Sequence, residues 1–226
     1  MTQIKAITFD LDGTLARGAF DSERFQKALI DYLRKIGYSG GTGAVNKARQ
    51  VMLEKMKSHQ ARNVELRFDL LYSYLLFDLG LEITQERLAH IEGLYNRFFE
   101  IEVFPGVKEM LAELKKKYKL AVVANAITNV SRLALEKLDL AKYFDYIVLS
   151  RDLGVRKPDL EIFVYALRSM WIKGSETIHV GDSLTDDVQG GKNAGMKTVW
   201  IKGDEETTNI HPDFVISKIT ELPSLL

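Results

Sequence analysis

Apolar residues follow two different patterns along this chain. The run Lys5–Phe9 is short and rich in β-branched side chains, and it stops at Asp10, as a buried parallel strand does where it enters a loop. From about Asp21 to Glu102, apolar residues instead recur every three or four positions, with Gly37 as a breaker. This spacing predicts four amphipathic helices, at about 25–36, 45–59, 64–79 and 84–99, the last with Thr84 as its N-cap.

After Phe104-Pro105-Gly106 the pattern changes to an alternation of helices and strands. Helices predicted at about 107–117, 129–138, 159–170 and 186–194 alternate with strands at about 120–124, 146–150, 177–181 and 197–201, and a last short strand lies near 214–216. This alternation is typical of an α/β fold with a parallel sheet and crossover helices. We therefore expect a core made of residues 1–15 and 103–226, interrupted by a helical insert at 16–102 that can cover the strand ends as a lid.

Composition narrows the class of protein. The 226 residues are 46% hydrophobic and 27% charged, which is typical of a soluble globular chain and not of a disordered one. The 31 basic and 31 acidic residues cancel, so no overall field would attract nucleic acid or an anionic membrane, and neither partner is expected. Because cysteine is absent, disulfides, thiolate metal sites and a cysteine nucleophile are excluded.

Two features of the sequence bear on location. The N-terminus reaches Asp10 after a single short apolar run, which is too soon for the apolar stretch and cleavage site of a signal peptide. The most apolar stretch, 70–81, is interrupted by Asp78 and is well short of the roughly 20 residues of a membrane span. We therefore expect a cytoplasmic protein.

Four polar clusters follow the predicted strands: Asp10-Leu11-Asp12-Gly13-Thr14, Asn125-Ala126, Arg156-Lys157-Pro158-Asp159 and the segment from Gly181 to Asp187. The carboxyl ends of parallel strands meet at one edge of a sheet, so these clusters should lie together. Their carboxylates form an oxygen-rich set suited to Mg²⁺. Lys157 adds a positive charge that can offset both a carboxylate and a phosphate.

With these motifs in this order, the chain resembles the haloacid dehalogenase-like hydrolase superfamily over essentially its whole length, in particular the members with a helical cap inserted after the first motif. Asp10–Thr14 looks like the first motif of the family, Lys157-Pro158 like the third, and Gly181-Asp182 with the acids at 186 and 187 like the fourth. The resemblance implies a Rossmann-like core with an α-helical bundle as its cap domain. It also implies an Mg²⁺-dependent phosphatase that acts on a small phosphorylated metabolite.

The resemblance implies a role for each acidic motif residue. Asp10 would attack phosphorus and form an aspartyl-phosphate, and Asp12 would act as the general acid and base. Mg²⁺ would be held by Asp10, by the backbone carbonyl of Asp12 and by Asp182, with Asp187 completing or orienting this set of ligands. We favour Asp187 over Asp186, because the sequence that begins at Asp187 looks like that of the family.

One position departs from the family pattern. The second motif normally places Ser or Thr at the end of the second strand, followed by Asn, whereas here Ala124 precedes Asn125. Losing a hydrogen bond to a charged group, which is worth about 1.5–3 kcal/mol, would cost about ten- to a hundredfold in transition-state stabilisation. Backbone N–H groups near Asn125, or Thr128, can still bind phosphate. The expected phosphate contacts are Thr14, Asn125, Ala126 and Lys157, of which Lys157 is also catalytic.

Three other functions fit the same residues. A 2-haloacid dehalogenase uses an aspartate that attacks carbon without a metal, but that chemistry makes no use of a second acid such as Asp12. A phosphomutase would keep both aspartates and return the phosphoryl group to a sugar. A protein that binds phosphate and metal but catalyses weakly is suggested by Ala124.

The remaining polar candidates are less specific. The four histidines, His59, His90, His179 and His211, share no ligand spacing, and we interpret all four as structural. Because the cap selects the leaving group in this superfamily, the candidates for contact with the substrate in the insert are Arg17, Arg24 and Tyr32.

Overall fold

A six-stranded parallel sheet forms the centre of the computed structural model, which describes residues 3–203 and 209–226. Its strands, in the order β5-β4-β1-β6-β7-β8, are Tyr146–Leu149, Lys119–Ala124, Ala6–Phe9, Thr177–Gly181, Lys197–Ile201 and Phe214–Ile216. Every pairing between neighbouring strands is parallel. The α/β fold class predicted from the alternation is therefore confirmed. β4 and β5 lie on one side of β1, and β6, β7 and β8 lie on the other.

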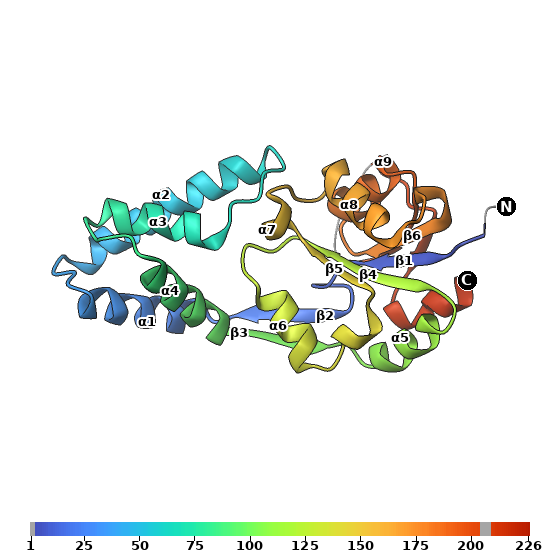
Figure 1. Ribbon diagram of the computed structural model, residues 1–226, viewed down its shortest axis with the longest axis horizontal. Helices are drawn as coiled ribbons and strands as arrows, with labels where there is room; N and C mark the ends of the chain where they lie inside the picture. The colour runs from blue at the N-terminus through green and yellow to red at the C-terminus, as the bar shows by residue number, and fades with distance from the viewer. Residues whose placement is uncertain (1–2, 204–208) are drawn as a thin grey trace.

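Helices cover both faces of this sheet (Figure 1). On one face, apolar side chains of the strands pack against α5, α6 and the terminal helical turn η4, at Val107–Lys115, Val130–Lys137 and Ile219–Leu225. The other face is covered by α8, the π-type turn η3 and α9, at Leu160–Met170, Leu184–Gln189 and Gly190–Asn193. Short helical elements complete the core at Ala141–Tyr143 (η1), Ser150–Leu153 (α7) and Gly174–Glu176 (η2). The buried sheet leaves the loops after its strands as the place for polar chemistry.

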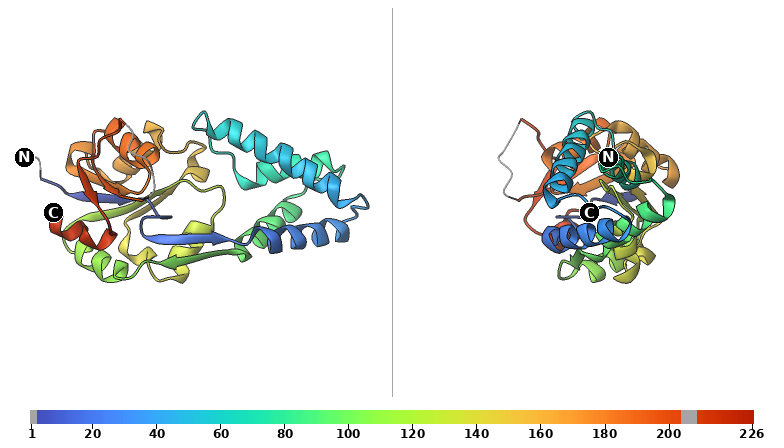
Figure 2. Two further views of the ribbon diagram at one scale, coloured as in Figure 1. Left: turned by 180° about the vertical axis from the view of Figure 1, so that it is seen from behind. Right: turned by 90° about the vertical axis from the view of Figure 1, so that its left-hand side faces the viewer.

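The helical insert forms a second apolar cluster, at the end of the molecule opposite the two termini (Figures 1 and 2). Its helices are α1 Ser22–Lys35, α2 Thr42–Gln60, α3 Phe68–Asp78 and α4 Gln85–Arg97. The Thr84 side chain accepts a hydrogen bond from the backbone N–H of Arg87 at 3.2 Å, which confirms the predicted N-cap. The third predicted helix begins too early: α3 starts at Phe68, and Val64 instead forms a β-bridge with Val155 of the core.

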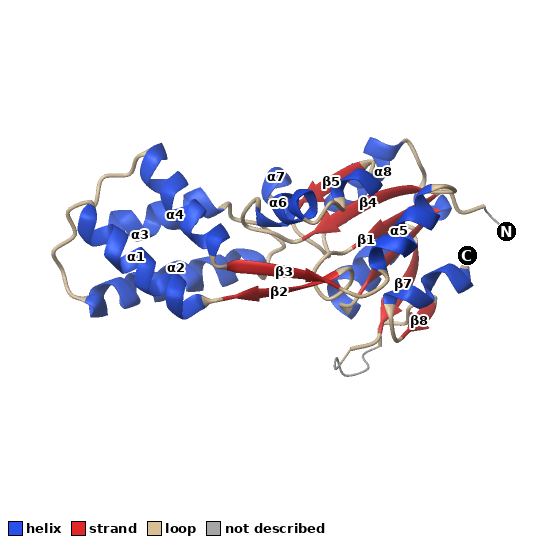
Figure 3. Cartoon of the chain, turned by 90° about the horizontal axis from the view of Figure 1, so that it is seen from below, coloured by secondary structure: helices blue, strands red, loops and turns tan. Residues whose placement is uncertain are grey.

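The insert begins and ends in a two-stranded antiparallel ribbon that the sequence pattern does not predict. Strands β2 (Ala16–Phe20) and β3 (Phe99–Val103) pair with Gly18 opposite Ile101, and they join the helical bundle to the sheet (Figure 3). The prediction of an all-helical insert is therefore wrong at both of its ends. Side chains of β3 alternate between half-buried and exposed, as in a strand, but the pairing partner lies far away in sequence and a local pattern cannot identify it.

The helix predicted at 186–194 also differs in the structure. The chain instead forms η3 and then the short helix α9. The Ser183 carbonyl accepts hydrogen bonds from the backbone N–H groups of both Asp187 and Val188, at 3.0 and 3.1 Å, which widens the first turn. In the described residues, every helix is too short or too polar to cross a membrane.

Candidate active site

Lys157 lies at the centre of the site, between two aspartates. Its Nζ donates to Oδ1 of Asp10, directly after β1, and to Oδ1 of Asp187 in η3, both at 2.6 Å. All three side chains are buried. Burial acts to lower the pKa of Lys157, but the two carboxylates outweigh it and raise that pKa, so the lysine stays charged.

The pKa values of the two carboxyl groups are shifted in opposite directions. Burial raises the pKa of Asp10 to about 7, although Lys157 acts against this rise. Burial also acts to raise the pKa of Asp187, but Lys157 and His179 outweigh it and hold that pKa well below its usual range. Asp187 is therefore the fixed negative charge of the pair, and the charge of Asp10 is the less compensated of the two.

A third carboxylate joins these two. Oxygen atoms of Asp10, Asp182 and Asp187 lie within 4.8 Å of one another. Burial, followed by the charge of Asp187, raises the pKa of Asp182 to about 6. One lysine cannot neutralise three carboxylates, and a set of hard oxygen donors with excess negative charge fits Mg²⁺.

Asp187 is held on every side by protein donors. Besides Lys157, its Oδ1 lies 3.0 Å from Nε2 of His179, and its Oδ2 accepts from the backbone N–H of Ser183 at 3.1 Å. The other ring nitrogen of His179 lies 2.8 Å from Oγ1 of Thr8. Burial lowers the pKa of His179, so the ring is neutral, and an ionised Asp187 requires the proton on Nε2. The sequence predicts a structural role for this histidine; its position in the strand that ends at Gly181, directly before the acidic motif, is the signal that links it to the site.

Two glycines allow the carboxylates to approach the backbone. A Cβ on Gly13, which has a φ of +82°, would lie 2.0 Å from Oδ2 of Asp182. A Cβ on Gly181 would lie 2.1 Å from the Cγ of Asp187. Since no side chain fits in either space, the glycines of the first and fourth motifs bring the acidic groups together.

Asp12 lies in the same cavity as Asp10 but outside the carboxylate cluster. Its Oδ1 accepts a hydrogen bond from the backbone N–H of Gly18 at 2.6 Å, so β2 orients it. The residue is exposed. A carboxyl group that reaches both the cavity and solvent can exchange protons, as a general acid and base must.

The expected phosphate contacts have different surroundings. The Asn125 side chain lines the cavity but is engaged with the loop of Lys157, donating to the Lys157 carbonyl at 3.2 Å and accepting from its N–H at 2.8 Å. Asn125 also donates to Asp186 at 3.0 Å, which places Asp186 beside this loop and not in the carboxylate cluster. The Ala126 N–H donates to Oγ of Ser150 at 2.8 Å. A phosphate that used Ala126 would have to replace that bond.

Thr14 is not at this cavity, contrary to expectation. It is fully buried and borders a separate hollow with Phe104 and Lys218. The chain turns sharply at Gly13, with the Leu15 N–H bonded to the Leu11 carbonyl at 2.9 Å, and this turn carries Thr14 away from Asp10.

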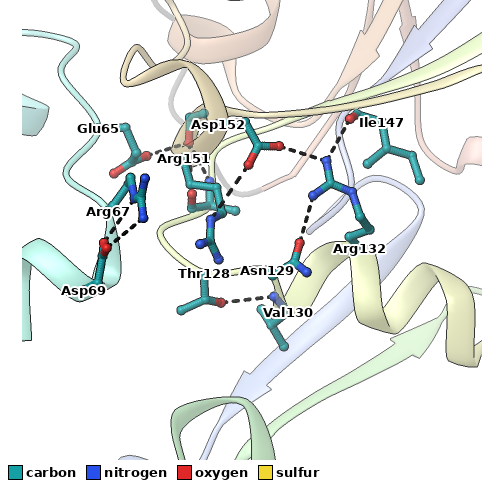
Figure 4. A network of polar contacts seen from close by, with 12 residues as sticks. Glu65, Arg67, Asp69, Thr128, Asn129, Val130, Arg132, Ile147, Arg151 and Asp152 are labelled. Carbon is teal, nitrogen blue, oxygen red and sulfur yellow. Dashed lines mark hydrogen bonds and ion pairs between the residues drawn. The ribbon is translucent and has the colours of Figure 1, made fainter. Parts of the chain in front are cut away.

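The cavity that contains Asp10 has a volume of about 280 Å³ and lies between the loops of the sheet and the helical insert. Ala124, Thr128 and Ser131 border it, so two hydroxyl-bearing residues line the same cavity as the position where the family hydroxyl is missing. The Thr128 Oγ1 accepts from the backbone N–H of Val130 at 3.1 Å (Figure 4).

None of the candidates from the insert, Arg17, Arg24 and Tyr32, borders this cavity. Arg17 and Arg24 lie over aromatic rings, and Tyr32 stacks on His90 at 4.0 Å between ring centroids. The insert contributes other residues instead: Met56, Gln60 and Glu65 from α2 and the segment after it, and Tyr95 from α4. Only the packing of these helices determines which side chains face the sheet.

Comparison with known proteins identifies the class. A family model described as haloacid dehalogenase-like hydrolase matches residues 4–195, and the chain belongs to this family. It is 32% identical over 231 residues to the glyceraldehyde 3-phosphate phosphatase of Pyrococcus furiosus, covering 100% of this chain and 93% of the relative. It is 29% identical over 246 residues to the N-acylneuraminate-9-phosphatase of Rattus norvegicus, covering 100% and 95%. The protein is thus a hydrolase whose full-length relatives include phosphatases.

A solved structure shows the same architecture. The 2-haloacid dehalogenase from Pseudomonas syringae pv. Tomato DC3000 matches with a TM-score of 0.74 and 28% identity, covering 99% of this chain and 98% of that chain. The family resemblance and the Rossmann-like fold predicted from the motifs are therefore confirmed.

Proposed function

We propose that this protein hydrolyses a small phosphomonoester through an aspartyl-phosphate on Asp10. The observation that carries the proposal is the position of Asp10: it is buried at the end of β1, bonded to Lys157, and borders a cavity that also contains Asp12. A carboxylate held in place by one cation is suited to attack phosphorus in line. The phosphatase names of two full-length relatives support this class of substrate.

The residues of the site divide the work between them. Lys157 holds Asp10 and offsets negative charge during attack. Asp12 would protonate the leaving oxygen and then accept a proton from the water that hydrolyses the aspartyl-phosphate. Asn125 and Asp187 keep Lys157 in place through its backbone and its Nζ.

The donor set fits Mg²⁺. Asp10 and Asp182 would hold the ion, together with the backbone carbonyl of Asp12, and Asp187 would complete or orient this set. When bound, Mg²⁺ supplies positive charge that offsets both the carboxylates and the phosphate oxygens.

We also propose that residues 1–15 and 103–226 form the catalytic core domain and residues 16–102 the cap domain. The separate apolar clusters of the sheet and the helical bundle support this division. The cavity is bordered by both parts, as expected if the cap selects the leaving group.

A 2-haloacid dehalogenase is the second candidate, since a protein of that name shares the fold at 28% identity. Asp12 and the three-carboxylate cluster argue against it, because attack of an aspartate on carbon needs neither a second acid nor a metal. Release of chloride from 2-chloropropionate tests this candidate directly.

The first experiment measures phosphate release from p-nitrophenyl phosphate with Mg²⁺ or with EDTA. We expect turnover that requires Mg²⁺, is lost in Asp10→Asn and is retained in the control Asp31→Asn, which changes an exposed aspartate. Acid-quenched protein should carry phosphate on Asp10. Full turnover in EDTA or in Asp10→Asn would contradict the proposal, and dependence on an added sugar bisphosphate would indicate a phosphomutase.

A further inference from the structure

Arg156 borders the cavity of Asp10, and its guanidinium makes no hydrogen bond to any of the described residues. It directly precedes Lys157, and its side chain is 18% exposed. In the described part of the chain, the one carboxylate within ion-pair distance is that of Glu65, with 3.9 Å between Nη1 and Oε2. At this distance the guanidinium makes no direct hydrogen bond to Glu65, so its N–H donors remain available to a ligand.

Glu65 comes from the helical insert, and its carboxylate is 1% exposed. The hydroxyl of Ser150 donates to Oε2 at 2.8 Å, and the amide of Gln60 approaches Oε1 at 3.5 Å. Figure 4 shows Glu65 at the contact between the insert and α7, which carries Arg151 and Asp152. A buried carboxylate with these two neighbours has a fixed position.

The backbone holds this group of side chains together. The Glu65 N–H donates to the Gly154 carbonyl at 2.9 Å, and the Arg156 N–H donates to the Asn63 carbonyl at 3.0 Å. Val64 and Val155 thereby form an antiparallel bridge between insert and core. Glu65 and Arg156 directly follow the two bridged residues, one on each strand, and both border the cavity of Asp10.

The charges of this group cancel. Arg156 contributes one positive charge and Glu65 one negative charge, while Gln60 adds a neutral amide that both donates and accepts. A carboxylate or second phosphate on the leaving group would be attracted by Arg156 but repelled by Glu65, so this negative charge would add little to the binding free energy. An alkyl group would leave the half-buried guanidinium of Arg156 without a hydrogen-bond acceptor, which is costly. Hydroxyl groups, which donate and accept at once, match the set.

Resting on the proposed phosphatase activity of this site, we infer that Gln60, Glu65 and Arg156 form a subsite for an uncharged, polyhydroxylated leaving group, as in a polyol or sugar phosphate. The cavity of about 280 Å³ limits this group to a small one. Met56, Tyr95 and Phe99 line the walls, where they can contact its carbon chain.

The test compares three four-carbon phosphomonoesters: erythritol 4-phosphate, 4-phosphoerythronate and butyl phosphate. The wild type should prefer erythritol 4-phosphate over each of the others by about tenfold or more in kcat/KM. Arg156→Gln should reduce the preference for erythritol 4-phosphate over butyl phosphate about tenfold, mainly by raising the KM for erythritol 4-phosphate. The matched control Arg168→Gln, at an exposed position on α8, should keep the wild-type ratios.

Glu65→Gln gives the most specific result. Glutamine can still accept from Ser150, but the substitution removes the negative charge that lies beside Arg156. The ratio of kcat/KM for 4-phosphoerythronate over erythritol 4-phosphate should therefore rise about tenfold. Equal ratios in the wild type, Arg156→Gln, Glu65→Gln and Arg168→Gln, with p-nitrophenyl phosphate still hydrolysed, would overturn the inference and leave the phosphatase proposal intact.

Binding separates the two proposals. Calorimetric titration of Asp10→Asn with the same three compounds and Mg²⁺ reads affinity without turnover. If the wild type hydrolyses nothing but this variant binds erythritol 4-phosphate at least tenfold more tightly than butyl phosphate, the subsite stands and the phosphatase proposal fails. Equal or absent binding of all three compounds overturns the subsite.

Discussion

Ala124 stands at the end of β4, where the family pattern has a hydroxyl. It is 3% exposed and borders the cavity of Asp10. Thr128 and Ser131 border the same cavity, but the Thr128 oxygen already accepts a backbone hydrogen bond. The effect of the missing hydroxyl on kcat/KM can therefore be measured by substituting this single residue.

Restoring the hydroxyl should raise activity. We expect Ala124→Ser to increase kcat/KM for p-nitrophenyl phosphate about tenfold, because a hydrogen bond to the charged phosphoryl group is worth about 1.5–3 kcal/mol. The control is Ala121→Ser on the same strand, which is buried and lies outside the cavity. If Ala124→Ser has wild-type kinetics, Thr128 or Ser131 already fills this role.

At the level of elements, the loops after β1 and β6 meet so closely that one backbone position decides the geometry. Gly13 faces the Asp182 carboxylate with no room for a methyl group. The β2–β3 ribbon, which continues from the β1 loop, fixes Asp12 through the Gly18 N–H. Asp12, the proposed acid–base residue, and the carboxylate cluster are thus positioned by different elements.

Gly13→Ala should separate the two acidic loops. The substitution costs about 1 kcal/mol of stability because of the left-handed backbone, and its Cβ must displace Asp182. We expect at least a tenfold higher Mg²⁺ requirement for turnover. Gly80→Ala is the matched control, since Gly80 has a φ of +68° but nothing within 4 Å of the added Cβ. Urea unfolding should show similar losses for both variants, whereas an equal loss of activity in both would contradict the steric explanation.

At the scale of the whole molecule, the buried titratable groups of the site make the stability of the folded protein depend on pH. Asp10 has its pKa raised to about 7 in the folded state, against roughly 3.9 in an unfolded chain. The folded protein therefore binds more protons than the unfolded one between these values, and the contribution of Asp10 to stability is lost as the pH rises through about 7. His179, whose pKa is lowered, acts in the opposite direction up to about pH 6.5.

A difference between two variants isolates the effect of Asp10. In EDTA, the free energy of unfolding of Asp10→Asn minus that of the wild type should increase from pH 5 to pH 8, because only the wild type loses the Asp10 contribution over this range. The contribution of His179 is the same in both proteins and cancels. Mg²⁺ should stabilise the wild type more at pH 8 than at pH 5, since it favours the ionised carboxylates. Urea unfolding at four pH values measures both quantities. A difference that is constant with pH would show that Asp10 is ionised throughout this range.

Much of the fold was determined by local sequence. Buried apolar runs such as Leu120–Ala124 and the helical spacing in α1 are properties of neighbouring residues, so the alternation and the parallel sheet could be predicted. The motif residues followed the strands, and parallel topology alone brings Asp10, Lys157 and Asp187 to one edge.

Tertiary structure decided the features that join residues distant in sequence. The pairing of β2 with β3, the contact of His179 with Asp187, and the meeting of Glu65 with Arg156 each depend on how separate elements pack. Thr14 lies away from the cavity because of one backbone turn, although its motif suggested otherwise. Periodicity reports which face of an element is buried, whereas the identity of the opposing side chain is set by packing across the whole chain.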